Sequence, residues 1–285
     1  MKWGLVLSGG GARGIAHVGL LKKLAAWKLR PDVVVGCSMG AIIGGAYACG
    51  MAPLEMERYL LEDFDIRSNL DSWVYHLSGG RLVKLLQAED ALHTLVRRRG
   101  IDRGRKMLDL LRRLTAEKDF SQTAIPFACN ALDLLSGREV ALDSGDVAEA
   151  ALASMAVPAV FAPVPREGML LVDGSFANSS PVWLARRLGV RRLLVHRVSV
   201  FSPIEDRKIS NSFSVLARTF AVMANALEET RRKQRGVLEL ISCDGNAALD
   251  FGRLGALIRL GEENAEAQRR RILRHVGKGR LFTAG

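Results

Sequence analysis

The chain has 285 residues, of which 48% are hydrophobic and 25% are charged. This length allows one large α/β domain or two small ones with a substantial core. No long polar low-complexity segment indicates disorder. The formal net charge of +11 favours anionic partners such as lipid headgroups or nucleic acid. No nucleic-acid-binding signature accompanies this charge, so we expect no nucleic acid partner.

Neither a membrane span nor a secretory leader is predicted. The longest weakly charged run, residues 150–164, contains Pro158 and Pro163 and is therefore a poor membrane span. The apolar part of the N-terminus is too short for a signal-peptide core. Four cysteines stand far apart without a C-x-x-C pair, which indicates reduced thiols rather than disulfides or a zinc site. We therefore expect a cytoplasmic protein without a bound metal.

The first part of the chain alternates apolar runs with helical patterns. Residues 3–7 predict a buried strand, and apolar positions at helical spacing predict a helix over 15–28. A second apolar run at 33–35 predicts another strand, which leads directly into a helix over 39–49. A proline at the first turn begins a further helix over 54–62.

The middle of the chain is the least regular part. Residues 63–80 are polar and aromatic with turn residues, and we interpret them as a loop or lid. Helices are predicted over 81–99 and 107–114. The basic stretch 97–118 is the best candidate for an insertion, because no linker rich in Pro, Gly or Ser divides the chain. We therefore expect a single domain over residues 1–285.

The remaining elements again alternate between strands and helices. Strands are predicted over 125–132, 139–142, 169–172, 192–200 and 237–242, and helices over 148–155, 181–188, 211–234 and 256–275. Such alternation implies a mainly parallel sheet with helices on both faces.

The stretch Gly36-Cys37-Ser38-Met39-Gly40 carries the strongest chemical signal. It lies between the second predicted strand and the helix that follows, so a serine occupies the apex of a sharp strand-to-helix turn. The first N–H groups and the dipole of that helix favour negative charge at the apex. This context favours a catalytic Ser38 over an ordinary N-cap serine. Cys37 is a rival nucleophile, but only the apex residue of such an elbow projects outward.

The sequence GGGARG at residues 9–14 allows two interpretations. It fits the dinucleotide fingerprint G-x-G-x-x-G, which requires an acidic residue about 20 residues later at the end of the next strand. Here Gly36, Cys37 and Ser38 occupy that place, so the nucleotide interpretation is disfavoured. Alternatively, the N–H groups of the loop hold an oxyanion. Loops after neighbouring parallel strands share one crevice, which would bring this loop to Ser38.

A serine nucleophile needs a base, and the choice lies between histidine and aspartate. The chain order Ser38, Asp173, His196 would allow a triad, but His196 lies inside a predicted strand. His17 could line the crevice, although helix packing explains it equally well. Asp173 follows a strand and precedes Gly174, and burial there would raise its basicity. An ordinary Asp-Gly turn is the alternative.

Together, these segments resemble the patatin-like phospholipase family, particularly its bacterial members. The glycine loop at 9–14, the serine motif at 36–40 and Asp173-Gly174 follow in the family's order, and 153–163 resembles the segment before the aspartate. The resemblance implies a three-layer α/β/α sandwich with a mainly parallel central sheet. It also implies hydrolysis of lipid acyl esters without a cofactor.

The resemblance assigns roles to individual residues. It implies that Ser38 and Asp173 form a dyad without histidine, within an elbow shaped by Gly36 and Gly40. The oxyanion hole would involve Gly9, Gly10, Gly11, Ala12, Arg13, Gly14 and Met39. Arg13 would either steer an anionic headgroup or form a salt bridge that locks the loop. Ser175 departs from the family, which usually has Gly or Ala there.

Two other functions stay open beside the lipid acyl hydrolase. One is a Rossmann nucleotide-binding protein, and the other is a regulator or membrane-surface binding module with the hydrolase fold. The expected partner is a lipid or acyl-ester substrate. The basic excess also allows peripheral association with an anionic membrane surface, on the inner membrane face.

Overall fold

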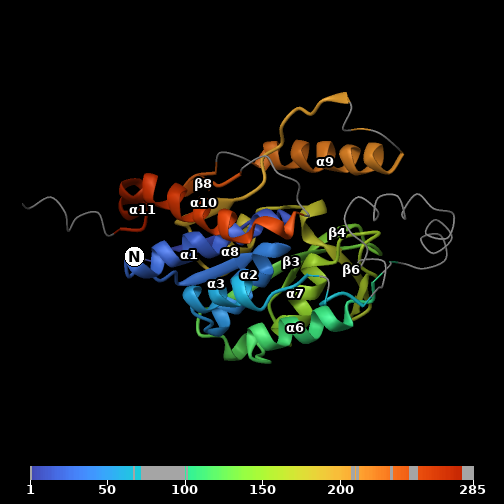
Figure 1. The fold of residues 1–285 in the computed structure, drawn as a ribbon, viewed down its shortest axis with the longest axis horizontal. Helices are drawn as coiled ribbons and strands as arrows, with labels where there is room; N and C mark the ends of the chain where they lie inside the picture. The colour runs from blue at the N-terminus through green and yellow to red at the C-terminus, as the bar shows by residue number, and fades with distance from the viewer. Residues whose placement is uncertain are drawn as a thin grey trace, which may run out of the picture.

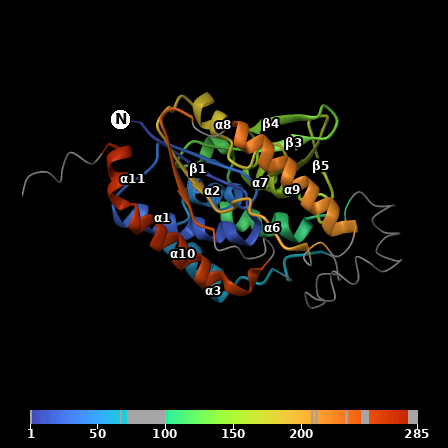
Figure 2. The ribbon, with the colours of Figure 1, turned by 90° about the horizontal axis from the view of Figure 1, so that it is seen from above.

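The computed structural model describes residues 2–66, 68–71, 100, 102–206, 209, 212–231, 234–243 and 250–277. In this part of the chain an eight-stranded sheet lies between layers of helices (Figures 1 and 2). Its strands are β1 (Gly4–Leu7), β2 (Val33–Gly36), β3 (Phe127–Asp133), β4 (Arg138–Leu142), β5 (Val164–Arg166), β6 (Met169–Asp173), β7 (Leu193–Arg197) and β8 (Val237–Ile241).

The longer helices are α1 (Ala16–Ala26), α2 (Met39–Cys49), α3 (Pro53–Glu62), α6 (Arg105–Thr115), α7 (Val147–Met155), α8 (Val182–Arg187), α9 (Ser212–Arg231), α10 (Leu254–Ala267) and α11 (Arg269–His275). Short 3₁₀ turns are η1 (Gly11–Ile15), η3 (Phe120–Gln122), η4 (Gly174–Phe176) and η6 (Phe251–Arg253). Two of these turns, η1 and η4, lie at the candidate site described below.

Each face of the sheet packs against its own helices, because successive strand residues point to opposite faces. On one face, Leu5 and Leu7 of β1 share a core with α1, α3, α10 and α11. On the other face, Val6 and Val35 pack with Leu184 of α8. The three-layer α/β/α sandwich implied by the resemblance is therefore the fold of this chain.

The sheet is mixed. Four of the seven strand pairings among the described residues are parallel, and they join β8, β7, β1, β2 and β3 in that order. β4, β6 and β5 add three antiparallel pairings on the β3 side. The predicted parallel character therefore belongs to the centre of the sheet. Hydrophobic patterns indicate that a segment is a strand but not its direction, so the sequence did not reveal the antiparallel part.

The pairing of β3 explains why two distant segments meet. Cys129 to Asp133 pair with β4 along one edge of β3. The other edge pairs with β2 up to Gly36, opposite Cys129, and with β6 from Asp173, opposite Ala131. β2 and β6 therefore lie end to end on the same edge and run toward each other. The residues that follow β2 and the last residue of β6 come together at that junction.

Most predicted elements occur within the described residues. Helix α2 has the predicted bounds, and most other strands and helices differ from the predictions by a few residues at their ends. The helix predicted over 256–275 is instead two helices, α10 and α11, separated at Gln268. Strand β5 was not predicted, because it is three residues long and contains Pro165, which is typical of edge positions. The predicted helix over 81–99 lies outside the described residues.

The predicted lid over 63–80 is described only in part. Phe64 packs against Tyr59 and Phe251, with ring centroids 6.3 and 6.1 Å apart. This residue therefore takes part in core packing rather than in a free loop. Residues 72–80 lie outside the described part of the chain, so the lid stays a prediction.

Helix α6 belongs to the basic stretch 97–118. It buries Met107, Leu110 and Leu111 in a core that also includes residues of α7. Its Arg112 forms ion pairs with the acidic residues at the start of α7. The described part of this stretch is therefore packed into the helical layer. Within the described residues, we find no helix that combines the length and the apolar character needed to cross a membrane.

Candidate active site

Ser38 occupies a strained turn between β2 and α2. Its backbone has φ 52° and ψ −122°, a region that residues other than glycine rarely adopt. The turn is tight because a side chain at Gly36 would overlap the carbonyl of Gly40, and one at Gly40 would overlap the carbonyl of Leu7. The surrounding packing therefore forces Ser38 into the geometry typical of a nucleophile elbow.

Ser38 donates a hydrogen bond directly to Asp173. The Ser38 Oγ lies 2.7 Å from Asp173 Oδ2, and the two residues are only 7% and 1% exposed. The second carboxylate oxygen, Oδ1, accepts from the Ser175 N–H at 2.8 Å. Burial raises the pKa of Asp173, while the hydrogen bonds from Ser38 and Ser175 oppose that shift. This carboxylate is therefore a stronger base than an ordinary aspartate.

Two contacts around this pair were not predicted from the sequence. The Ser38 N–H donates to the Oγ of Ser154, on α7, at 3.0 Å. Gly174 packs so tightly on Asn130 that an added Cβ would lie 2.6 Å from the Asn130 carbonyl oxygen. The only sequence signal for Ser154 was its membership of the segment 153–163, which matched the family.

The glycine loop lies against Ser38, as the sequence predicted. A Cβ added at Gly9 would be 3.4 Å from the Ser38 Cβ and 3.2 Å from the Ser175 Cβ. The Gly9 N–H already donates to the Ser179 carbonyl at 3.0 Å. Gly9 therefore contributes close approach to the serine. The next residue but one, Gly11, has φ 59° and begins η1, and the first N–H groups of a helix have no partner within it.

The other residues of the loop have packing roles. A Cβ at Gly10 would lie 2.6 Å from a methyl group of Val198. A Cβ at Gly14 would overlap the side chain of Met39, the first residue of α2, so Gly14 lets η1 pack on the elbow helix. Arg13 donates from Nε to the Gly10 carbonyl at 3.3 Å. That bond ties the Arg13 side chain to the backbone of the loop.

The two histidines considered as bases bond to each other. His17 Nδ1 lies 2.9 Å from His196 Nδ1, and the outer nitrogens reach the Ser8 carbonyl and the Ser242 hydroxyl, each at 2.9 Å. A carbonyl only accepts, so His17 Nε2 carries a proton and His17 Nδ1 accepts from His196. His196 Nε2 then accepts from Ser242. Both ring nitrogens of His196 are therefore occupied away from Ser38.

Burial keeps this histidine pair neutral. It lowers the pKa of His17 to about 4 and lowers the pKa of His196 well below its ordinary value.

Cys37, the rival nucleophile, is fully buried, and burial raises its pKa, so it stays a thiol. Asp32, the residue before β2, accepts from the Trp3 N–H at 2.8 Å, whereas a ribose-binding acid would lie at the other end of that strand.

The family model for patatin-like phospholipase matches residues 5–186. The chain belongs to the patatin-like phospholipase family. The resemblance drawn from the glycine loop, the serine motif and Asp173-Gly174 is thereby confirmed at the level of the family. The match spans β1 to α8 and so includes all of these motifs.

Several proteins are similar to this patatin-like chain. An uncharacterized NTE family protein of Mycobacterium tuberculosis is 32% identical over 62% of this chain and 44% of its own length. The lysophospholipase NTE1 of Cryptococcus neoformans is 28% identical over 74% of this chain and 12% of its own. The structure of VipD from Legionella pneumophila has a TM-score of 0.54 at 15% identity, over 93% of this chain and 66% of that one, which shows the fold. The chain thus spans under half the length of the mycobacterial relative.

Proposed function

We propose that this protein hydrolyses acyl esters of lipids, with Ser38 as the nucleophile and Asp173 as the general base. The observation that carries the proposal is the 2.7 Å hydrogen bond from Ser38 Oγ, held at a strained elbow, to a buried carboxylate. The family membership supports a lipid ester as substrate, as does the name of the lysophospholipase relative. A cytoplasmic location stays a prediction from the sequence.

In the first half of the reaction, Asp173 accepts the hydroxyl proton while Ser38 Oγ bonds to the carbonyl carbon of the ester. The carbonyl oxygen becomes an oxyanion, and we assign its stabilisation to the N–H groups of Gly10, Gly11 and Ala12, with that of Met39. Asp173 then gives its proton to the departing alcohol oxygen, which leaves an acyl-enzyme.

In the second half, water replaces the alcohol. Asp173 accepts a proton from the water as its oxygen bonds to the acyl carbon, and the Ser38 oxygen leaves and recovers the proton. The raised pKa of Asp173 suits both steps, because a more basic carboxylate accepts a proton more readily. The reaction must therefore slow as the pH falls through this pKa, since the protonated acid accepts no proton.

The test is hydrolysis of a short-chain p-nitrophenyl ester. We expect Ser38→Ala to lose turnover by about 10⁴-fold or more, while Ser144→Ala, an exposed serine on the surface, serves as the matched control. Mixing at high substrate should also release a burst of p-nitrophenol equal to the enzyme, as acyl-enzyme accumulates. Wild-type turnover in Ser38→Ala would end the proposal.

A further inference from the structure

Helix α9 presents its apolar side to the solvent. Leu216, Phe220, Met223 and Leu227 recur at the spacing that aligns residues along one side of a helix, and they are 54%, 43%, 56% and 44% exposed. The neighbouring row adds Val215 and Val222, at 51% and 46%. Figure 1 shows this helix at the outside of the molecule.

Four polar side chains of α9 lie on its partly buried side. Ser214, Arg218, Asn225 and Glu228 are each half-buried, whereas the apolar row is exposed. A surface helix of a globular protein normally has the reverse arrangement, with the apolar stripe toward the core. Apolar rows of this size on a surface mark a place where something else binds.

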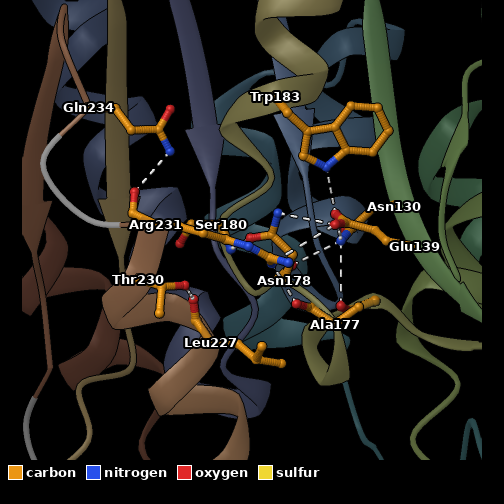
Figure 3. A network of polar contacts seen from close by, with 11 residues as sticks. Asn130, Glu139, Ala177, Asn178, Ser180, Trp183, Leu227, Thr230, Arg231 and Gln234 are labelled. Atoms are coloured by element: carbon orange, nitrogen blue, oxygen red, sulfur yellow. Dashed lines mark hydrogen bonds and ion pairs between the residues drawn. The ribbon is translucent and has the colours of Figure 1, made fainter. Parts of the chain in front are cut away.

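The end of α9 is bound to the segment that follows Asp173. Glu228 accepts from the Ser180 hydroxyl at 3.0 Å and pairs with Arg197 at 3.1 Å. Arg231 donates to the Ala177 carbonyl at 2.6 Å, as Figure 3 shows. These bonds hold the polar side of the helix on the body of the protein and so keep the apolar row outward.

The same network of polar contacts continues from Arg231 to Asn130, which lies next to the candidate active site. Glu139 lies 4.0 Å from Arg231 and accepts from Asn130 and Trp183 at 2.9 and 2.7 Å (Figure 3). Asn130 is the residue on which Gly174 packs.

The apolar row itself also touches the turn after Asp173. Phe220 meets Phe176 of η4 edge to face, with ring centroids 5.9 Å apart. The exposed apolar side of α9 therefore contacts the turn η4, which begins directly after Asp173.

The exposed apolar side of α9 could bind a second copy of this chain or a lipid surface, and the net charge of the chain favours the lipid surface. A second copy would bring two chains of formal net charge +11 together, and their like charges oppose association. An anionic lipid surface attracts the same charge. If the proposed function holds, the ester substrate also resides in such a surface.

We propose that α9 is an interfacial helix, whose apolar row inserts into an anionic lipid surface beside the active site. This inference rests on the proposed function for the identity of the lipid, and on the geometry of α9 for the surface. Insertion would bring the turn that carries Asp173 against the layer in which the ester bonds lie.

The test compares two pairs of exposed apolar residues. The first variant is Leu216→Ser with Met223→Ser on α9, and the matched control is Leu54→Ser with Leu61→Ser on α3, which are 68% and 54% exposed. Flotation with vesicles of phosphatidylglycerol and phosphatidylcholine measures partition. We expect the α9 variant to partition about tenfold less than wild type, because two apolar side chains no longer enter the lipid. The α3 control should stay within about twofold.

Further measurements separate this inference from the proposed function. Turnover of a water-soluble p-nitrophenyl ester should stay within about twofold in the α9 variant, while hydrolysis of vesicle lipid falls with partition. Ser38→Ala should partition like wild type. Loss of soluble-ester turnover in Ser38→Ala bears on the proposed function alone, and vesicle partition bears on α9 alone.

Two results would overturn the inference. One is equal partition of the α9 variant and the α3 control. The other is a wild-type dimer in light scattering that becomes a monomer in the α9 variant while vesicle binding persists. That result would make the face an interface between copies of this chain.

Discussion

Ser38 and Asp173 form one buried polar pair of this fold, and His17 and His196 form another. Both pairs are short hydrogen bonds between segments far apart in the chain, at 2.7 and 2.9 Å. One pair carries the strained elbow and faces the glycine loop. The other lies beneath that loop and bonds to the Ser8 carbonyl, one residue before Gly9.

Burial acts on the two pairs with opposite chemical effects. It disfavours the charged form of every group, so it raises the pKa of the Asp173 carboxyl and lowers those of the two imidazoles. Asp173 becomes a stronger base and the histidines become weaker ones. The residue type that most often serves as a catalytic base is therefore weakened as a base in this interior.

The largest expected difference between the pairs is in turnover. Asp173→Asn removes the proton acceptor and should lower kcat for a p-nitrophenyl ester by about 10⁴-fold. His196→Asn keeps a donor at the place of Nδ1 and should retain turnover within about tenfold. A severe loss in His196→Asn, with its fold intact by circular dichroism and Asp173→Asn active, would make the base a histidine.

The next effect is on stability at acid pH. The pKa of His17 falls from 6.5 unfolded to about 4 folded, so the stabilising effect of the neutral form is present above 6.5 and is lost as the pH falls toward 4. This loss corresponds to about 3 kcal/mol of unfolding free energy. Denaturant titrations across this range should show it in wild type.

A variant assigns this acid sensitivity to His17. His17→Gln keeps an N–H donor for the Ser8 carbonyl and does not titrate, so its unfolding free energy should fall less steeply below pH 6.5. An unchanged slope in this variant would show that other groups cause the acid sensitivity.

Asp173 should show the opposite dependence on pH. Its folded pKa is raised, so its favourable contribution is present at low pH and is lost as the pH rises through that pKa. At neutral pH the buried carboxylate therefore costs stability. We expect Asp173→Asn to melt at the same temperature as wild type or higher at neutral pH, while turnover is lost. A clearly lower melting temperature at neutral pH contradicts this expectation.

The contrast between the pairs also shows what the sequence could and could not predict. The elbow was predictable because an apolar run, a serine between glycines and a helix of small residues follow one another within residues 33–49. The direct bond to Asp173 was not derivable from spacing, since it depends on β2 and β6 meeting along β3. Asp173 was a candidate from its place at the end of a strand, and the order of the family's motifs then favoured it over an ordinary turn.

Contacts across the fold were beyond the sequence for the same reason. His17 and His196 are 179 residues apart, and either one alone reads as ordinary packing. Ser154 is 116 residues from Ser38. The exposed apolar row of α9 has the spacing of a core helix, so the sequence predicted the helix but not the side that faces solvent. Which segments pair and which side chains are buried depend on how the strands and helices are arranged, and the local sequence pattern does not give that arrangement.

The smallest expected effect concerns Ser175, which stands where the family usually has Gly or Ala. Its backbone N–H donates to Asp173 Oδ1 at 2.8 Å, and any residue supplies that bond. Its hydroxyl also lowers the pKa of Asp173, after the larger effects of burial and of the Ser38 bond. Ser175→Ala should therefore keep the plateau kcat within about twofold. The acid limb of the pH–rate profile should move to slightly higher pH, because the pKa of Asp173 rises when this hydroxyl is removed. A fall of the plateau without movement of that limb would mean that the hydroxyl contacts the substrate instead.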